Sequence, residues 1–338
     1  MQRRCLIALA LILTLGGVTF TKASVGLAVG AFRVGIVLDK GGKDDKSFNA
    51  AAFKGAQEAE KTLGVTTKIL EGRDDNSSEP MLRSLAEKKF DLIIAIGFSQ
   101  ADAVRKVAAQ YPVSHFILVD AEVTAPNVES LMFEEHQGAF LVGMIAALTS
   151  KTGKVGFIGG MDIPLIRRFQ LGYAAGVKHA NAKTQVLVNY VGVTGEAWNN
   201  PPKGKELALA QYAAGADVIF AAAGASGSGV FDAAEEKKKL AIGVDSNQNW
   251  VKPGFILTSL LKRVDLGVYQ AIAAAKQGGF KSGTTRFGLG SQGVDFAVDA
   301  FNAKILSGDV IAKANAAKAE ILAGKIQVPD YYKLAHPK

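Results

Sequence analysis

Nine short apolar runs alternate with amphipathic segments along most of this 338-residue chain, and this alternation limits the possible folds more than any other feature. Short turns separate the two kinds of segment, which is typical of parallel sheets covered by helices. Nine strands are too many for one compact lobe of usual size, so we predict an α/β protein with two Rossmann-like lobes. The predicted strands are 32–38, 66–70, 91–96, 115–119, 154–158, 186–191, 217–222, 240–244 and 255–261. The predicted helices are 47–63, 80–89, 99–110, 136–149, 164–180, 203–214 and 229–239.

The N-terminal segment is typical of an export signal. Two arginines precede an apolar run over residues 6–15, which is too short to span a bilayer as a mature helix. Small residues near Ala23 and at 28–31 offer cleavage points, so we predict a signal peptide over residues 1–23; a retained anchor is the alternative. Because Cys5 precedes the apolar run, it cannot serve as a lipobox cysteine, and we expect a periplasmic protein without stable membrane insertion.

The net charge of the chain does not indicate a nucleic-acid partner. The whole chain carries a formal charge of +8, and removing the signal with Arg3, Arg4 and Lys22 lowers this charge to +5. No basic run is interleaved with aromatic residues, and the longest positive block, 237–239, fits the end of a helix. We therefore expect no nucleic acid among the partners.

The sequence contains no recognisable catalytic motif. Its four histidines share no metal-ligand spacing, and the HExxH, GxxxxGK[ST] and GxSxG patterns are absent. We therefore expect no metal, no cofactor and no catalytic role.

Polar and small residues follow the predicted strands at the points where those strands end. Asp39, Asp120 and Asp245 each come directly after an apolar run, and Gly224 follows another. Because ligands of open α/β sheets bind beyond the carboxyl ends of the strands, we expect these residues to border a cleft between the lobes. Carboxylates there can accept hydrogen bonds from the hydroxyl groups of a neutral ligand. The alternative is that the aspartates cap helices or turns.

The segment 39–49, DKGGKDDKSFN, joins the first predicted strand to the first predicted helix. Ser47 is placed to cap that helix, which puts Phe48 and Asn49 in its first turn. One aromatic and two polar side chains at this position can bind a small, planar, polar molecule. An ordinary strand–helix turn is the alternative, and we expect the acidic pair 44–45 to be solvated there.

The same segment, with AAFKGAQEA after it, resembles the opening signature of the basic membrane protein family. These proteins are solute receptors of ABC importers, and most of them are taken to bind purine nucleosides. The resemblance continues in order through nearly the whole mature chain. Its further motifs are YPVSHFILVD (111–120), KTGKVGFIGGMDIP (151–164), GADVIFAAAG (215–224), IGVDSNQ (242–248) and LTSLLKRVD (257–265).

The resemblance implies the fold of a type I periplasmic binding protein, whose two lobes with parallel sheets are joined by a three-strand hinge. We place lobe 1 at 31–133 and 259–282, and lobe 2 at 134–258 and 283–338. The implied ligand is a purine nucleoside, namely guanosine, adenosine or inosine, and the implied partner is the permease of an ABC transporter. We expect a monomer. Another small polar solute, such as a sugar, is the alternative ligand. A periplasmic nucleoside hydrolase, in which aspartates bind a metal beside a ribose, is the enzymatic alternative.

The resemblance also assigns roles within the expected cleft. Phe48 matches a family aromatic that stacks on the ligand, and Lys262 matches a lysine that approaches the ribose and its aspartate. Trp198 is a second stacking candidate, or packs on its own prolines, while Asn49 and Gln248 could read the edges of the base. The residues expected to bind the ligand are Asp39, Ser47, Phe48, Asn49, Asp120, Trp198, Gly224, Asp245, Gln248 and Lys262.

Overall fold

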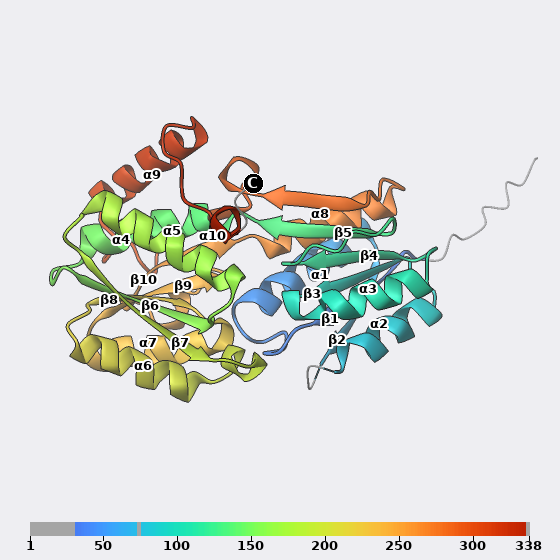
Figure 1. Ribbon diagram of the computed structural model, residues 1–338, viewed down its shortest axis with the longest axis horizontal. Helices are drawn as coiled ribbons and strands as arrows, with labels where there is room; N and C mark the ends of the chain where they lie inside the picture. The colour runs from blue at the N-terminus through green and yellow to red at the C-terminus, as the bar shows by residue number, and fades with distance from the viewer. Residues whose placement is uncertain (1–30, 73–75, 336–338) are drawn as a thin grey trace, which may run out of the picture. The chain divides into compact units, whose positions relative to one another are not determined.

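Two α/β lobes make up the described residues, 31–72 and 76–335, of this computed structural model (Figure 1). The first lobe contains β1 (Arg33–Leu38), α1 (Phe48–Leu63), β2 (Thr66–Glu71), α2 (Ser78–Glu87), β3 (Leu92–Ile96), η1 (Phe98–Gln100), α3 (Ala101–Gln110), β4 (His115–Val119), β5 (Val128–Phe133), α8 (Val264–Lys276) and β11 (Gly283–Phe287). The second contains α4 (Glu135–Thr149), β6 (Lys154–Met161), α5 (Pro164–Ala180), β7 (Gln185–Gly192), η2 (Gly195–Trp198), α6 (Pro201–Ala213), β8 (Val218–Ala222), η3 (Gly224–Ser226), α7 (Gly227–Lys237), β9 (Leu240–Asp245), η4 (Asn249–Val251), β10 (Ile256–Lys262), η5 (Leu289–Ser291), β12 (Val294–Phe296), α9 (Gly308–Leu322) and α10 (Tyr331–Ala335).

The two sheets repeat one topology. The strand order is β2-β1-β3-β4-β5-β11 in the first sheet and β7-β6-β8-β9-β10-β12 in the second. The pairings are parallel apart from the one between β10 and β12. β4 and β9 therefore hold equivalent places, and Asp120, just after β4, corresponds to Asp245 at the end of β9.

Helices cover both faces of each sheet, as the alternating sequence pattern predicts (Figure 1). In the first lobe α1 packs with α8, and α2 packs with α3 on the opposite face. In the second lobe α4 packs with α5, and α6 packs with α7. The α4–α5 contact is close because Gly143 lacks a side chain: a Cβ there would lie 2.2 Å from the carbonyl oxygen of Tyr173. The first turns of α5, which begins at Pro164, contribute Leu165, Ile166 and Phe169 to the cavity described below.

All nine predicted strands and all seven predicted helices are present, with ends that differ by a few residues. Within the described residues, three strands and three α-helices were not predicted, namely β5, β11, β12, α8, α9 and α10. β11 is a mostly exposed edge strand of sequence GTTRF, so it lacks the apolar run that identified the others. β12 has only three residues, which is too short to produce a periodic pattern.

The strand pairing corrects two of the predicted lobe boundaries. β10 belongs wholly to the second sheet, although the predicted boundary at 258/259 divides it. β11 pairs with β5 at the edge of the first sheet, although residues 283–338 were assigned to lobe 2. The chain therefore passes between sheets just after Phe133, Lys262 and Phe287.

The predicted signal peptide, its cleavage point and Cys5 lie outside the described residues. Within 31–72 and 76–335, none of the helices combines the length and the apolar character needed to cross a bilayer.

Candidate functional site

A cavity lies between the carboxyl ends of strands from both sheets, where the sequence predicts a ligand site. Eight of the ten predicted ligand residues line it: Asp39, Phe48, Asn49, Asp120, Trp198, Gly224, Asp245 and Lys262. The other residues that line the cavity were not predicted from the sequence to bind the ligand. They are Lys40, Asp45, Gly97, Phe98, Leu165, Ile166, Phe169, Ala222 and Val244. The cavity thus combines a polar rim of carboxylates with an apolar wall.

The loop before α1 is built around Asp45, which the sequence placed among solvated residues. Its side chain is buried, with 8% of its surface exposed. Asp45 Oδ1 accepts hydrogen bonds from the backbone amides of Ser47 (2.8 Å) and Ala50 (2.9 Å), and Oδ2 accepts one from the amide of Asn49 (2.9 Å). Burial raises the pKa of this carboxyl, and the three backbone amides oppose the rise. The prediction of solvation is therefore wrong for Asp45, which caps the start of the helix.

We expect Asp45→Asn to lower the free energy of unfolding by about 1–3 kcal/mol, because an amide cannot accept all of these backbone bonds. The adjacent Asp44→Asn is a matched control, since Asp44 is exposed and pairs with Lys43, 2.5 Å away. Its effect should stay within about 0.5 kcal/mol. Urea unfolding curves of both variants give the comparison, and equal effects would contradict the assignment.

Asn49 supports this loop from the first turn of α1. Its Oδ1 accepts a hydrogen bond from the backbone amide of Asp39 at 3.0 Å, and its Nδ2 donates to the carbonyl of Lys40 at 3.1 Å and to Asp45 at 3.0 Å. These contacts favour a role in holding Asp39 at the cavity over a role in reading a base.

Ser47 and Gln248 do not line the cavity, contrary to their expected place, because their side chains join the two lobes beside it. Ser47 holds the N-cap position of α1 without a side-chain cap bond, and its Oγ instead donates to Asp245 Oδ2 at 2.5 Å. Gln248 Nε2 donates to the carbonyl of Lys46 at 3.0 Å, while its Oε1 accepts from the amide of Val244. Both residues are thus interlobe contacts.

Lys262, at the end of β10, lies at the centre of the polar rim and is only 2% exposed. Its Nζ is 2.5 Å from Asp120 Oδ2, 3.1 Å from Glu135 Oε1 and 5.1 Å from the centre of the Phe48 ring. Glu135 is fully buried and was not predicted, since it begins α4 without any pattern that marks a site. The predicted approach of Lys262 to an aspartate is present.

The ammonium group of Lys262 interacts with three buried carboxylates, those of Asp120, Glu135 and Asp245. Burial disfavours the charged form of Lys262, but Asp120, Glu135 and Asp245 outweigh this effect and raise its pKa. Burial also raises the pKa of Asp120 to about 7, against the effect of Lys262, and that of Asp245 to about 6. These aspartates therefore change their charge near neutral pH.

Asp120 has an unusual backbone conformation and a buried carboxylate oxygen without a partner among the described residues. Asp120 and Asp245 have φ angles of 72° and 63°, in the left-handed region that few residues other than glycine, asparagine and aspartate occupy. Asp120 Oδ1 is buried and has no hydrogen-bond partner among the described residues. A buried acceptor of this kind can take a hydrogen bond from a bound ligand.

Aromatic rings from both lobes also line the cavity. Phe48 and Phe98 come from the first lobe, and Phe169 and Trp198 come from the second. The Trp198 ring lies edge-on to Phe98, with 6.3 Å between ring centres and an angle of 71°. It also rests on Gly160, where a Cβ would lie 2.2 Å from the indole. Phe169 lies within α5 and is separated in sequence from every predicted motif, so only the folded chain reveals it.

Comparisons with known proteins identify a family and several relatives that match most of this chain. The model of the Bmp family, described as ABC transporter substrate-binding protein PnrA-like, matches residues 32–331. A CD4+ T-cell-stimulating antigen of Listeria monocytogenes is 36% identical over 323 residues, covering 88% of this chain and 88% of the relative. The ABC transporter nucleoside-binding protein BmpA of Lactococcus lactis subsp. cremoris is 34% identical over 348 aligned residues, covering 96% and 97%. The crystal structure of an ABC transporter solute-binding protein from Aeropyrum pernix K1 has a TM-score of 0.81 and 29% identity, covering 88% of this chain and 94% of that one.

Proposed function

This chain belongs to the Bmp family of PnrA-like ABC transporter substrate-binding proteins, and on that premise we propose that it captures a purine nucleoside between its lobes. The family is described as ABC transporter substrate-binding proteins, and we propose that this chain acts as a receptor rather than as an enzyme. The two lobes with mostly parallel sheets have the fold of type I periplasmic solute-binding proteins, as the sequence predicts. Guanosine, adenosine and inosine are the ligands that we propose.

The observation that carries the proposal is one cavity lined by both carboxylates and aromatic rings. Asp120 presents a buried carboxylate oxygen without a partner among the described residues, and Phe48 and Trp198 line the same cavity. Sugar hydroxyls can donate to the carboxylate, and the flat face of a purine can stack on aromatic rings. The name of the Lactococcus lactis relative, a nucleoside-binding protein, agrees with this combination.

Binding is proposed to occur by closure of the lobes about the three chain crossings. Several contacts join the lobes around the cavity, including the Ser47–Asp245 hydrogen bond and an ion pair of 2.8 Å between Lys40 and Glu196. A ligand that touches Phe48 on one lobe and Trp198 on the other favours the closed form, since only that form provides both contacts. The closed receptor then delivers its ligand to the permease of an ABC transporter.

We further propose that the protein is exported by a signal peptide cleaved near Ala23, and that it acts in the periplasm as a monomer without a lipid anchor. Cleavage of these twenty-three residues removes two arginines and one lysine, so the formal charge of the mature receptor would fall from +8 to +5.

The direct experiment is isothermal titration of the purified, ligand-stripped protein with guanosine, adenosine, inosine, uridine and ribose. Stripping is needed because closed receptors can retain a cellular ligand. We expect a purine nucleoside to bind with a dissociation constant of about 1 μM or below, which corresponds to a free energy of binding of about −8 kcal/mol or more negative. Ribose should give no heat. Ribose binding without any nucleoside binding would overturn the proposal in favour of a sugar receptor.

Phe48→Ala is expected to weaken binding of the purine nucleoside by about ten-fold or more, because stacking of a base on an aromatic ring contributes about 1–3 kcal/mol. Phe280→Ala is the control, since Phe280 stacks on His115 with 4.1 Å between ring centres and does not line the cavity. Titration of both variants measures the difference. Equal affinity of Phe48→Ala and the wild type would remove the stacking role.

A further inference from the structure

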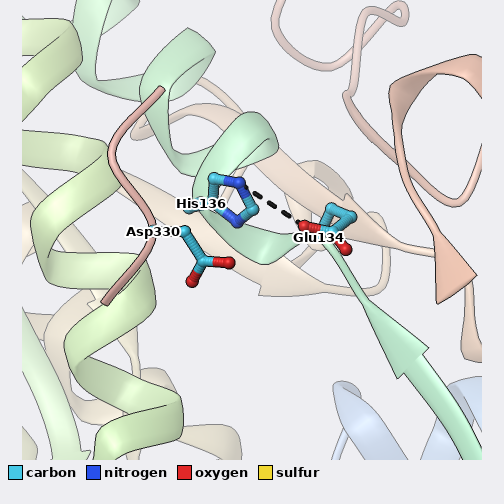
Figure 2. A group of neighbouring side chains, drawn as sticks. All are labelled: Glu134, His136 and Asp330. Atoms are coloured by element: carbon cyan, nitrogen blue, oxygen red, sulfur yellow. Dashed lines mark ion pairs between the residues drawn. The ribbon is translucent and has the colours of Figure 1, made fainter. Parts of the chain in front are cut away.

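Three side chains next to the cavity form a cluster that could at first be taken for a metal site. Glu134, His136 and Asp330 point toward one another, and their ligand atoms lie within 4.8 Å of each other (Figure 2). However, a single nitrogen of Arg168, Nη2, lies 3.0 Å from Glu134, 3.1 Å from His136 Nδ1 and 3.2 Å from Asp330. Burial and the guanidinium lower the pKa of His136 to about 4, so its neutral ring can accept this hydrogen bond. The cluster holds a guanidinium group.

Arg168 is held from the C-terminal end of the chain. Its Nε donates to Asp330 Oδ1 at 2.7 Å and its Nη2 to Oδ2 at 3.2 Å, so both oxygens of Asp330 bind one edge of the guanidinium. The ring of Tyr332 lies over the same group, 4.5 Å from the Arg168 Cζ atom. Arg168 itself is fully buried on α5. The segment around Asp330 therefore fixes the position of an arginine in the interior.

Arg168 is connected to the cavity through Glu135. Its Nη1 donates to Glu135 Oε2 at 2.5 Å, and the other oxygen of Glu135 is 3.1 Å from Lys262 Nζ. Lys262 in turn pairs with Asp120, which lines the cavity. The charge network thus runs without a gap through Asp330, Arg168, Glu135, Lys262 and Asp120.

We propose that Asp330 and Arg168 are positioning residues of the binding site, which hold Lys262 through Glu135 and thereby make the C-terminal segment part of ligand recognition. As a statement about ligand affinity, this inference rests on the proposed nucleoside function. Glu135 is shared between two cations, so the strength of its pair with Arg168 decides how strongly it holds Lys262. Lys262 then decides how much of the Asp120 carboxylate is available to the ligand.

Two variants should change the pairing of Lys262 with Asp120 in opposite directions. In Asp330→Asn, Arg168 loses a charged partner, pairs more closely with Glu135 and frees Lys262, which then pairs more closely with Asp120 and competes with the ligand. In Arg168→Lys, one ammonium cannot replace the forked contacts of a guanidinium, so Glu135 draws Lys262 away from Asp120. Guanosine affinity near pH 8 should fall by about three- to ten-fold in Asp330→Asn, whereas Arg168→Lys, which leaves more of the Asp120 carboxylate available, should bind guanosine at least as tightly as the wild type.

The direction in which the titration midpoint of Asp120 moves distinguishes a positioning role from general damage to the fold. The charged groups that face Asp120 are Lys262, Glu135 and Asp245, with the Tyr332 hydroxyl nearby. Closer pairing with Lys262 favours the ionised form of Asp120, so its titration midpoint should move to lower pH in Asp330→Asn. Weaker pairing should move the midpoint to higher pH in Arg168→Lys.

The test combines carboxyl carbon NMR titration of Asp120 in the ligand-free protein with calorimetric titration of guanosine. Arg167→Lys and Asp162→Asn are matched controls, because Arg167 precedes Arg168 on α5 and forms an exposed forked pair with Asp162 at 2.6 and 2.8 Å. Both controls should leave the midpoint and the affinity unchanged.

Unchanged midpoints in folded Asp330→Asn and Arg168→Lys would overturn the inference, and Asp330→Asn alone decides it if Arg168→Lys does not fold. Absence of guanosine binding by the wild type would count against the proposed ligand only. Opposite midpoint shifts in the ligand-free variants would still support the network in that case.

Discussion

Replacing Lys262 with methionine should lower the free energy of unfolding by about 3–5 kcal/mol near pH 8, because it leaves buried carboxylates without their cation. Lys262 is 2% exposed and pairs with Asp120 at 2.5 Å and Glu135 at 3.1 Å. Methionine has a similar shape, so little of the loss would come from a cavity. Most of the loss would be electrostatic.

The pH dependence of this loss identifies its origin. The pKa values of Asp120 and Asp245 are raised from 3.8 to about 7 and about 6, so a proton on either group stabilises the folded state. That contribution is complete below about pH 4 and disappears as the pH rises through 6 to 7. Without Lys262 both values should rise further, so the difference between variant and wild type should be small near pH 5 and largest near pH 8.

Lys252→Met is the matched control, since Lys252 also bridges two carboxylates, Asp232 at 3.1 Å and Glu235 at 2.5 Å, but on the surface. Its effect should be about 1 kcal/mol at most. Urea unfolding near pH 5 and pH 8 measures both variants. A loss for Lys262→Met that is equally large at both pH values would contradict the electrostatic explanation.

Asp120→Ala should weaken binding of the purine nucleoside by ten-fold or more, on the order of 1.5–3 kcal/mol for a charge-assisted hydrogen bond. The reason is the buried Oδ1 of Asp120, which has no partner among the described residues and which we propose accepts a hydrogen bond from a ribose hydroxyl. The fold should survive, since Lys262 keeps Glu135 as a partner.

Asp162→Ala controls for the loss of any aspartate beyond a strand end, because Asp162 follows β6 but pairs with Arg167 at 2.6 Å on the surface. Calorimetric titration of guanosine, adenosine and inosine compares the two variants with the wild type. If Asp120→Ala binds as tightly as the wild type, Asp120 does not contact the ribose.

The helices and strands could be predicted where each of them produces a pattern within its own short stretch of sequence. Each buried parallel strand is an apolar run of several residues, and each helix has a repeating apolar face, so both appear in a single sequence. The repeated topology of the two sheets was not visible, because no sequence similarity between the halves accompanies it. It nevertheless explains why Asp120 and Asp245 face one cavity from equivalent strands.

The site was predictable to the extent that it lies beyond strand ends. Asp39, Asp120, Asp245 and Gly224 all follow strands and all line the cavity. Asp44 and Asp45 show the limit of this reasoning, since they are adjacent and chemically identical, yet one is exposed and the other is buried against three backbone amides. Only the path of the loop distinguishes them.

The charge network was beyond sequence reasoning for a different reason. Glu135, Arg168 and Asp330 come from α4, α5 and the C-terminal segment, so no spacing along the chain relates them. A fully buried arginine and glutamate are also uncommon enough that sequence patterns favour the surface for both. Their contacts depend on the crossing of α4 and α5 and on the return of the C-terminus to α5.

A crystal structure of the protein with guanosine is the most direct test of how the cavity is used. We expect electron density for the base between Phe48 and Trp198, and for a ribose hydroxyl at about 2.7–3.2 Å from Asp120 Oδ1. Guanosine bound outside this cavity, or with its base on the aspartates and its ribose on the aromatic rings, would contradict the proposed mode of recognition.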